Sequence, residues 1–139
     1  VAMLFISHDL AVVQEFADRV AVLYRGEIMQ LADTATLLSA PLHPYTEMLL
    51  EAAPGLRKDH YVSPPPAVPA SKAVPEIGCP LTGRCPRQVG SVCAERRPLL
   101  RETLGGFIRC HIRVSELELR AGSPERKPLA KIAPVPLRS

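Results

Sequence analysis

The residues best suited to chemistry are four cysteines in the second half of the chain: Cys79, Cys85, Cys93 and Cys110. They are separated by five, seven and sixteen residues, and two of them precede proline. Cysteine thiolates bind zinc and iron–sulfur clusters, and a Cys-Pro step recurs in bacterial ferredoxin motifs. The spacing is neither that of ferredoxins nor the short CxxC typical of zinc knuckles, and His111 beside Cys110 is poorly placed to join the same ion. An iron–sulfur cluster, a zinc site and free buried thiols therefore all remain open.

A second candidate site lies at Ser7-His8-Asp9, directly after the apolar run VAMLFI at positions 1–6. Such an unbroken run predicts a strand covered on both faces of a parallel sheet. Ligands of parallel α/β sheets bind beyond the carboxyl ends of the strands, and histidine can donate a hydrogen bond to a phosphate. The alternative is a histidine at the end of a loop that only helps to cap a helix.

The elements that must position these residues follow from periodicity and turn signals. A helix begins just past His8, with Ser7 or Asp9 as N-cap. Strands at 20–24 and 27–31 form a hairpin around Arg25-Gly26. Two further helices follow, one stopped by Pro41 and one with Pro44 in its first turn that ends before Pro54.

Composition divides the chain into segments. Residues 1–56 carry two basic and seven acidic side chains, whereas residues 57–139 carry fifteen and seven. Six prolines between positions 54 and 75 predict an extended linker, assigned to 57–77. A cysteine-rich, irregular extension follows at 78–120, and a disordered tail at 121–139.

The chain has no apolar run long enough to span a membrane and no basic segment ahead of its first apolar run, so a soluble, cytoplasmic protein is expected. Disulfides are disfavoured in that compartment. The arginines of the basic half stand in proline-rich sequence without interleaved aromatic residues, which favours a solvated or partner-facing surface, and no nucleic acid is expected as a partner. The start at valine suggests a piece of a longer chain.

The ordered succession of ISHDL, ADRVAVLYRGEI, HPYT and CP…CP…C…CH carries a specific resemblance. It resembles the C-terminal part of the ATP-binding subunit of oligopeptide and dipeptide ATP-binding cassette (ABC) transporters. The implied fold class is α/β, namely the C-terminal portion of a P-loop NTPase (the ABC nucleotide-binding domain) at 1–56, followed by the linker and the extension.

The resemblance implies roles for the candidate residues. His8 would be the switch histidine that contacts the γ-phosphate of ATP and helps arrange the attacking water, while Ser7 and Asp9 would hold the loop and the helix start. The four cysteines would bind a 4Fe–4S cluster, with zinc as the alternative.

The resemblance also implies partners and a location. The partners would be a second ATP-binding subunit, membrane permease subunits and, indirectly, a substrate-binding protein, at the cytoplasmic face of the bacterial inner membrane. Peptide would be the cargo, although nickel import is a close relative.

Several parts of an ATPase site do not occur in the sequence. There is no GxxxxGK[ST] loop (Walker A) to cradle phosphates and hold Mg²⁺, no signature loop, and no Asp-Glu pair on a strand (Walker B) ahead of the histidine. We therefore expect residues 1–139 to show no ATPase activity alone. The rival hypothesis is a stand-alone metal-binding interaction module with a basic surface.

Overall fold

The computed structural model describes residues 2–53 and 76–122. Its helices are α1 (Leu10–Phe16), α2 (Thr34–Ser39), α3 (Pro44–Ala52), α4 (Val92–Glu95) and α5 (Val114–Ala121). Its strands are β1 (Arg19–Tyr24), β2 (Glu27–Asp33), β3 (Leu100–Thr103) and β4 (Gly106–Arg109). Most of the predicted linker, 57–77, and nearly all of the predicted tail, 121–139, lie outside the described residues.

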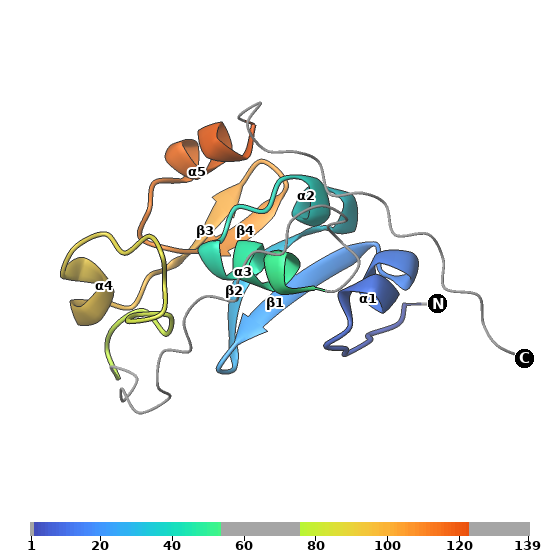
Figure 1. The fold of residues 1–139 in the computed structure, drawn as a ribbon, viewed down its shortest axis with the longest axis horizontal. Helices are drawn as coiled ribbons and strands as arrows, with labels where there is room; N and C mark the ends of the chain where they lie inside the picture. The colour runs from blue at the N-terminus through green and yellow to red at the C-terminus, as the bar shows by residue number, and fades with distance from the viewer. Residues whose placement is uncertain (1, 54–75, 123–139) are drawn as a thin grey trace, which may run out of the picture.

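In the described ranges the four strands form one antiparallel sheet in the order β1-β2-β4-β3 (Figure 1). The pairing of β2 with β4 aligns Gln30 with Ile108 and Ala32 with Gly106. The predicted units 1–56 and 78–120 therefore contribute strands to the same sheet.

The β1–β2 hairpin confirms the sequence prediction. Its two-residue loop, Arg25-Gly26, has φ of 51° and 80°, the backbone of a type I′ turn. A register shift between Val22 and Leu23 marks a bulge in β1. The two helices predicted after the hairpin are also present as α2 and α3.

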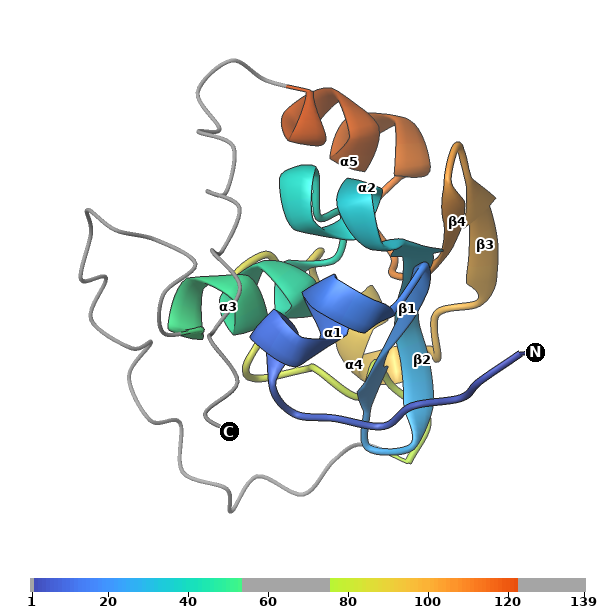
Figure 2. The same ribbon diagram turned by 90° about the vertical axis from the view of Figure 1, so that its right-hand side faces the viewer.

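Helices α2, α3 and α5 gather on one side of the sheet (Figure 2). The buried side chains form three clusters, one around Met29, one around Leu37 and one around Ile108 and Leu117, and these four residues are at most 1% exposed. Met29 packs with Cys79, Leu81 and Cys93, so part of the cysteine segment belongs to the core.

The predicted strand at 1–6 is wrong. Residues 2–7 form no strand, and Leu4 and Ile6 are 91% and 89% exposed. A fully apolar run is buried only where neighbouring strands and helices cover it, and within the described ranges no strand pairs with this segment. The expected parallel sheet is likewise replaced, in the described part of the chain, by antiparallel pairing.

The extension is more regular than predicted, because it contains α4, β3, β4 and α5. Leu100–Thr103 and Gly106–Arg109 form a second hairpin that turns at Leu104-Gly105. Through β4, this hairpin pairs with β2.

Among the described helices, none has the length and apolar character that a membrane crossing requires.

Candidate functional site

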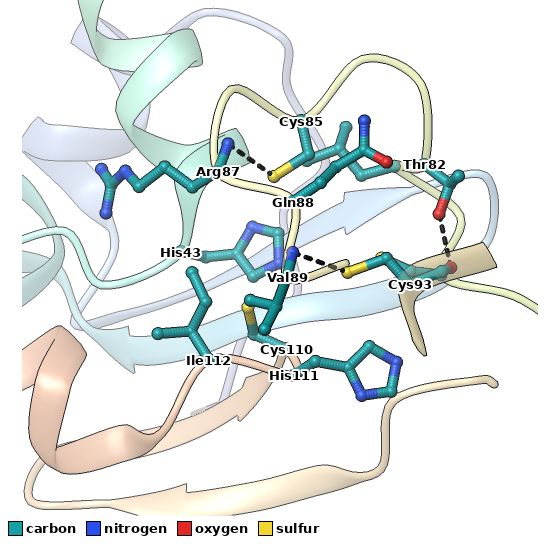
Figure 3. Close-up of a pocket in the computed structure, with 12 residues that line it drawn as sticks. His43, Thr82, Cys85, Arg87, Gln88, Val89, Cys93, Cys110, His111 and Ile112 are labelled. Atoms are coloured by element: carbon teal, nitrogen blue, oxygen red, sulfur yellow. Dashed lines mark hydrogen bonds between the residues drawn. The ribbon is translucent and has the colours of Figure 1, made fainter. Parts of the chain in front are cut away.

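The four cysteines line one pocket of the described structure (Figure 3). Cys79, Cys93 and Cys110 are buried, Cys85 is half-buried, and all four are free thiols. Cys93 lies on α4, Cys110 directly follows β4, and Cys79 and Cys85 flank a series of turns.

Backbone hydrogen bonds bring two of these cysteines together. The amide of Cys79 donates to the carbonyl of Cys93 at 2.7 Å, and the Thr82 hydroxyl donates to the same carbonyl at 2.5 Å. Gly83 and Gly90 have φ of 82° and 60°, which lets the chain reverse between the cysteines. The glycines flanking the cysteines thus serve convergence.

Two thiols also accept backbone hydrogen bonds. The amides of Arg87 and Val89 lie 3.4 Å from the Sγ atoms of Cys85 and Cys93 (Figure 3). Amides aimed at sulfur stabilise negative charge there, and such contacts help set the potential of thiolate-bound clusters.

Burial disfavours the thiolate form of three of the cysteines, Cys79, Cys85 and Cys110, because it raises their pKa values. It raises the pKa of Cys85 to about 12, and the neighbouring cysteines add to this effect by repulsion. Burial likewise raises the pKa values of Cys79 and Cys110. A bound cation would have to offset this cost, because thiolates rather than thiols are metal ligands.

The donor set fits a thiophilic metal in type, but its geometry is not that of a finished site. Within residues 2–53 and 76–122, no three His, Cys, Asp or Glu side chains are arranged so that they could hold a metal ion. The His111 ring is hydrogen-bonded through Nε2, 2.8 Å from the carbonyl of Arg96. The four sulfurs share a pocket, and metal binding would require them to draw closer.

His43 is a member of this pocket that sequence analysis missed. It is the N-cap of α3 and is 2% exposed, with Nδ1 accepting from the Tyr45 amide at 3.0 Å. Its Nε2 lies 3.1 Å from the carbonyl oxygen of Arg109. Burial lowers the pKa of His43 to about 4, against a smaller upward effect of that hydrogen bond. The sequence signal that could have identified His43 as an N-cap is its place directly before Pro44 at the start of a predicted helix.

Ion pairs join the extension to the first half of the chain. The Glu27 carboxylate lies 3.0 Å from the Arg97 guanidinium and 3.5 Å from that of Arg109. On α3, Glu47 pairs with Arg87, and both side chains are largely buried. Three of the arginines predicted to be a solvated face or partner surface, Arg97, Arg109 and Arg87, are thus used in internal contacts.

Ser7, His8 and Asp9 lie together at the start of α1, and all three are exposed. Asp9 caps the helix, with its Oδ1 accepting from the Ala11 amide at 2.9 Å, and its own amide donates to the Ser7 hydroxyl at 2.9 Å. The serine and the carboxylate therefore order the backbone on both sides of His8, while the imidazole extends into solvent.

A family model matches the part of the chain that contains most of the cysteine pocket. Residues 29–93 match the family model described as "Oligopeptide/dipeptide transporter, C-terminal region". The matched stretch includes His43 and three of the cysteines, and Cys110 lies beyond it.

Similar proteins extend the likeness to most of the chain. It is 41% identical over 123 residues to a probable peptide ABC transporter ATP-binding protein of Sinorhizobium fredii, covering 81% of this chain and 33% of the relative. It is 43% identical over 119 residues to a putative peptide import ATP-binding protein of Brucella ovis, covering 80% and 35%. It is 40% identical over 114 residues to the oligopeptide transport ATP-binding protein AppF of Bacillus subtilis, covering 78% and 34%.

The chain thus spans about a third of the length of these relatives. Both findings agree with the resemblance that ISHDL, HPYT and the cysteines indicate. This chain is thus similar to the C-terminal part of peptide ABC transporter ATP-binding proteins, and its residues 29–93 match the C-terminal region of the oligopeptide/dipeptide transporter family.

Proposed function

We propose that this chain supplies the C-terminal part of the ATP-hydrolysing subunit of an ABC transporter that imports peptides. The observation that carries the proposal is the 40–43% identity, over about four fifths of the chain, to proteins named for ATP binding and peptide transport. The names of these relatives favour peptide over nickel as the cargo.

In this subunit His8 acts as the switch histidine. Phosphoryl transfer depends mainly on positioning and on stabilising charge, and an imidazole N–H near the γ-phosphate contributes to both. Ser7 and Asp9 support this role, because their hydrogen bonds order the loop and the start of α1 without occupying the ring of His8. ATP and Mg²⁺ bind through a Walker A loop, which this sequence does not contain, so residues 1–139 have no ATPase activity alone.

The partners in this function are a second ATP-binding subunit and the membrane permease subunits. The subunit lies at the cytoplasmic face of the inner membrane. ATP joins two nucleotide-binding domains, and hydrolysis resets the permease.

The cysteine pocket serves as a metal centre, with a 4Fe–4S cluster as the occupant and zinc as the alternative. The support is the convergence of Cys79, Cys85, Cys93 and Cys110 on one pocket, together with amide donors to two of the sulfurs. When bound, the cluster supplies four iron–thiolate bonds that cross-link the extension.

A chimera tests the ATPase role. The 114 aligned residues of AppF are replaced by those of this chain, and peptide uptake and ATP turnover are measured with the cognate permease. We expect uptake to be retained. His8→Ala should lower ATP turnover by about 10²–10³-fold, as for loss of one donor to developing charge, with nucleotide binding preserved.

Glu15→Gln, an exposed change on the same helix, serves as the matched control and should leave turnover unchanged. A chimera that neither assembles with the permease nor hydrolyses ATP would contradict the proposed function. Full turnover in the His8→Ala chimera would contradict the role of the histidine alone.

Metal analysis tests the cysteine centre. The full chain is purified without oxygen, and iron, sulfide and zinc are measured per chain. We expect iron and sulfide in equal amounts in the wild-type chain, and loss of both in Cys93→Ser but not in Ser91→Ala, an exposed change two residues away. Stoichiometric zinc without iron would show that the site binds zinc and not a cluster. If neither iron nor zinc is found, the cysteines are free thiols and the proposed metal centre is wrong.

A further inference from the structure

We infer that His43 is a positioning residue of the cysteine pocket: its Nε2–H holds the Arg109 carbonyl and thereby fixes where the Cys110 thiol points. The inference deepens the proposed function, since it concerns the same thiol site, but its central observation is independent of which metal binds. His43 lies among the cysteines in the pocket lining (Figure 3).

The tautomer of His43 follows from its surroundings. Nδ1 faces the Tyr45 amide, which can only donate, so Nδ1 is unprotonated. The proton is therefore on Nε2, which donates to the Arg109 carbonyl. A charged ring is disfavoured because the side chain is 2% exposed and Nδ1 has no acceptor to face.

His43 is itself held rigidly. Its amide donates to the Gln30 side chain on β2 at 2.9 Å, and the residue is the N-cap of α3. Pairing between β2 and β4 ends at Gln30–Ile108, and the carbonyl of the following residue, Arg109, meets the imidazole instead. The imidazole thus contacts β4 directly after the last residue pair that joins β2 and β4.

The peptide on the other side of Cys110 is held as well. The Arg101 guanidinium donates to the carbonyl of Cys110 and, at 2.5 Å, to that of Ile112. With the carbonyls of residues 109 and 110 both engaged, the orientation of the Cys110 Cα–Cβ bond is fixed. Rotation about χ1 is then the remaining freedom of the Cys110 thiol, and this side chain lines the pocket.

The two ring nitrogens have separable roles, which allows a matched pair of variants. In His43→Asn the side-chain oxygen occupies the place of Nδ1, so the cap of α3 is kept and the donor to Arg109 is lost. In His43→Gln the side-chain NH₂ reaches the place of Nε2, so the donor is kept and the cap is lost. A residue that is only structural would make the two variants equivalent in the pocket.

The first measurement is the alkylation rate of each cysteine in the metal-free, reduced full chain, followed by peptide mass spectrometry. We expect Cys110 to react at least tenfold faster in His43→Asn than in the wild type, and within about threefold of the wild type in His43→Gln. Cys79, which His43 does not position, is the internal reference. Equal rates for Cys110 in both variants would overturn the inference.

The second measurement is a titration with Co²⁺ alone, read from its thiolate charge-transfer and d–d absorption bands. The wild type and His43→Gln should share one spectrum, and His43→Asn should bind 10–100-fold more weakly with shifted bands, as expected when the support of a metal ligand is lost. If no protein binds Co²⁺ but the Cys110 rates still differ, the metal centre fails and the positioning role stands.

A third measurement needs no variant. The ¹⁵N spectrum of the wild-type chain should show His43 protonated at Nε2 and unprotonated at Nδ1 at neutral pH. The opposite tautomer, or a ring charged at pH 7, would overturn the inference even if both variants fail to fold.

Discussion

Replacing Gly106 by alanine should detach the extension from the first hairpin. Gly106 begins β4 and is aligned with both Ala32 of β2 and Thr103 of β3. Its φ is 157°, and a Cβ there would overlap the carbonyl oxygen of Leu31 while standing 2.8 Å from the carbonyl carbon and 3.1 Å from the Cα of Ala32. These atoms are backbone in a paired strand, so no side chain can rotate away to make room.

The cost can be worked out from this geometry. A backbone held where L-residues rarely lie costs about 1–3 kcal/mol, and overpacking costs about 1–3 kcal/mol. Relief by strand separation would instead lose ladder hydrogen bonds at about 1 kcal/mol each. We therefore expect Gly106→Ala to lower the free energy of unfolding by about 3–5 kcal/mol.

The adjacent glycine is the matched control. A Cβ on Gly105 would lie 3.5 Å from the methyl group of Thr36, an ordinary van der Waals contact, and its φ is not in the left-handed region. Gly105→Ala should be neutral or stabilise the fold by up to about 1 kcal/mol, because it restricts the unfolded chain.

Urea unfolding followed by far-UV circular dichroism measures both variants, with cysteine alkylation reporting on the extension. Gly106→Ala should unfold at a midpoint lower than that of Gly105→Ala by about 2 M, for an m-value of ~2 kcal/mol/M. Free energies of unfolding within 0.5 kcal/mol of each other would refute the reasoning, and so would protected thiols in Gly106→Ala.

Three further predictions concern stability. Burial depresses the pKa of His43 to about 4, whereas the same residue in the unfolded chain is protonated below about pH 6.5. The free energy of unfolding should therefore be at its full value above about pH 7 and should fall by about 3 kcal/mol as the pH drops through 4. His43→Gln should flatten this dependence in urea titrations, and an unchanged slope would refute it. Glu27→Gln removes the carboxylate from two arginines and should cost about 1–2 kcal/mol, less at high salt, whereas Asp33→Asn at an exposed pair should cost under about 0.5 kcal/mol; equal losses would count against a stabilising role for the ion pairs of Glu27 with Arg97 and Arg109. Leu117→Ala should cost about 2–5 kcal/mol, and Leu119→Ala, at 77% exposure, under about 0.5 kcal/mol in thermal melts; similar melts would contradict the packing of α5.

Local signals predicted the first hairpin and the helices around it. Arg25-Gly26 specifies a tight turn, Pro41 stops α2, and Pro44 begins α3, and each of these signals acts within a few residues. The second hairpin has a weaker local signal, because LRET and GFIR do not alternate between apolar and polar residues on the two sides of the turn.

Non-local features were less accessible to sequence reasoning. The apolar run at 1–6 predicted a buried strand, but residues 2–6 are exposed. An apolar run shows that a segment could be buried, and whether it is buried depends on neighbouring elements elsewhere in the fold. The place of His43 beside the cysteines depends on the pairing of β2 with β4. The register of β2 against β4 pairs residues that are far apart in the sequence, and the periodicity of either segment alone does not specify this pairing.

The pairing of Gln30 with Ile108 joins positions 78 residues apart. At about 5–20 residues per second, the ribosome completes β2 roughly 4–16 s before it completes β4. A two-stranded hairpin is only marginally stable in water, and during that interval one side of β2 has no partner strand. Nascent chains therefore pass through a window in which an open strand edge can pair with another chain, and aggregation during synthesis, rather than of the finished protein, is the risk that this topology carries.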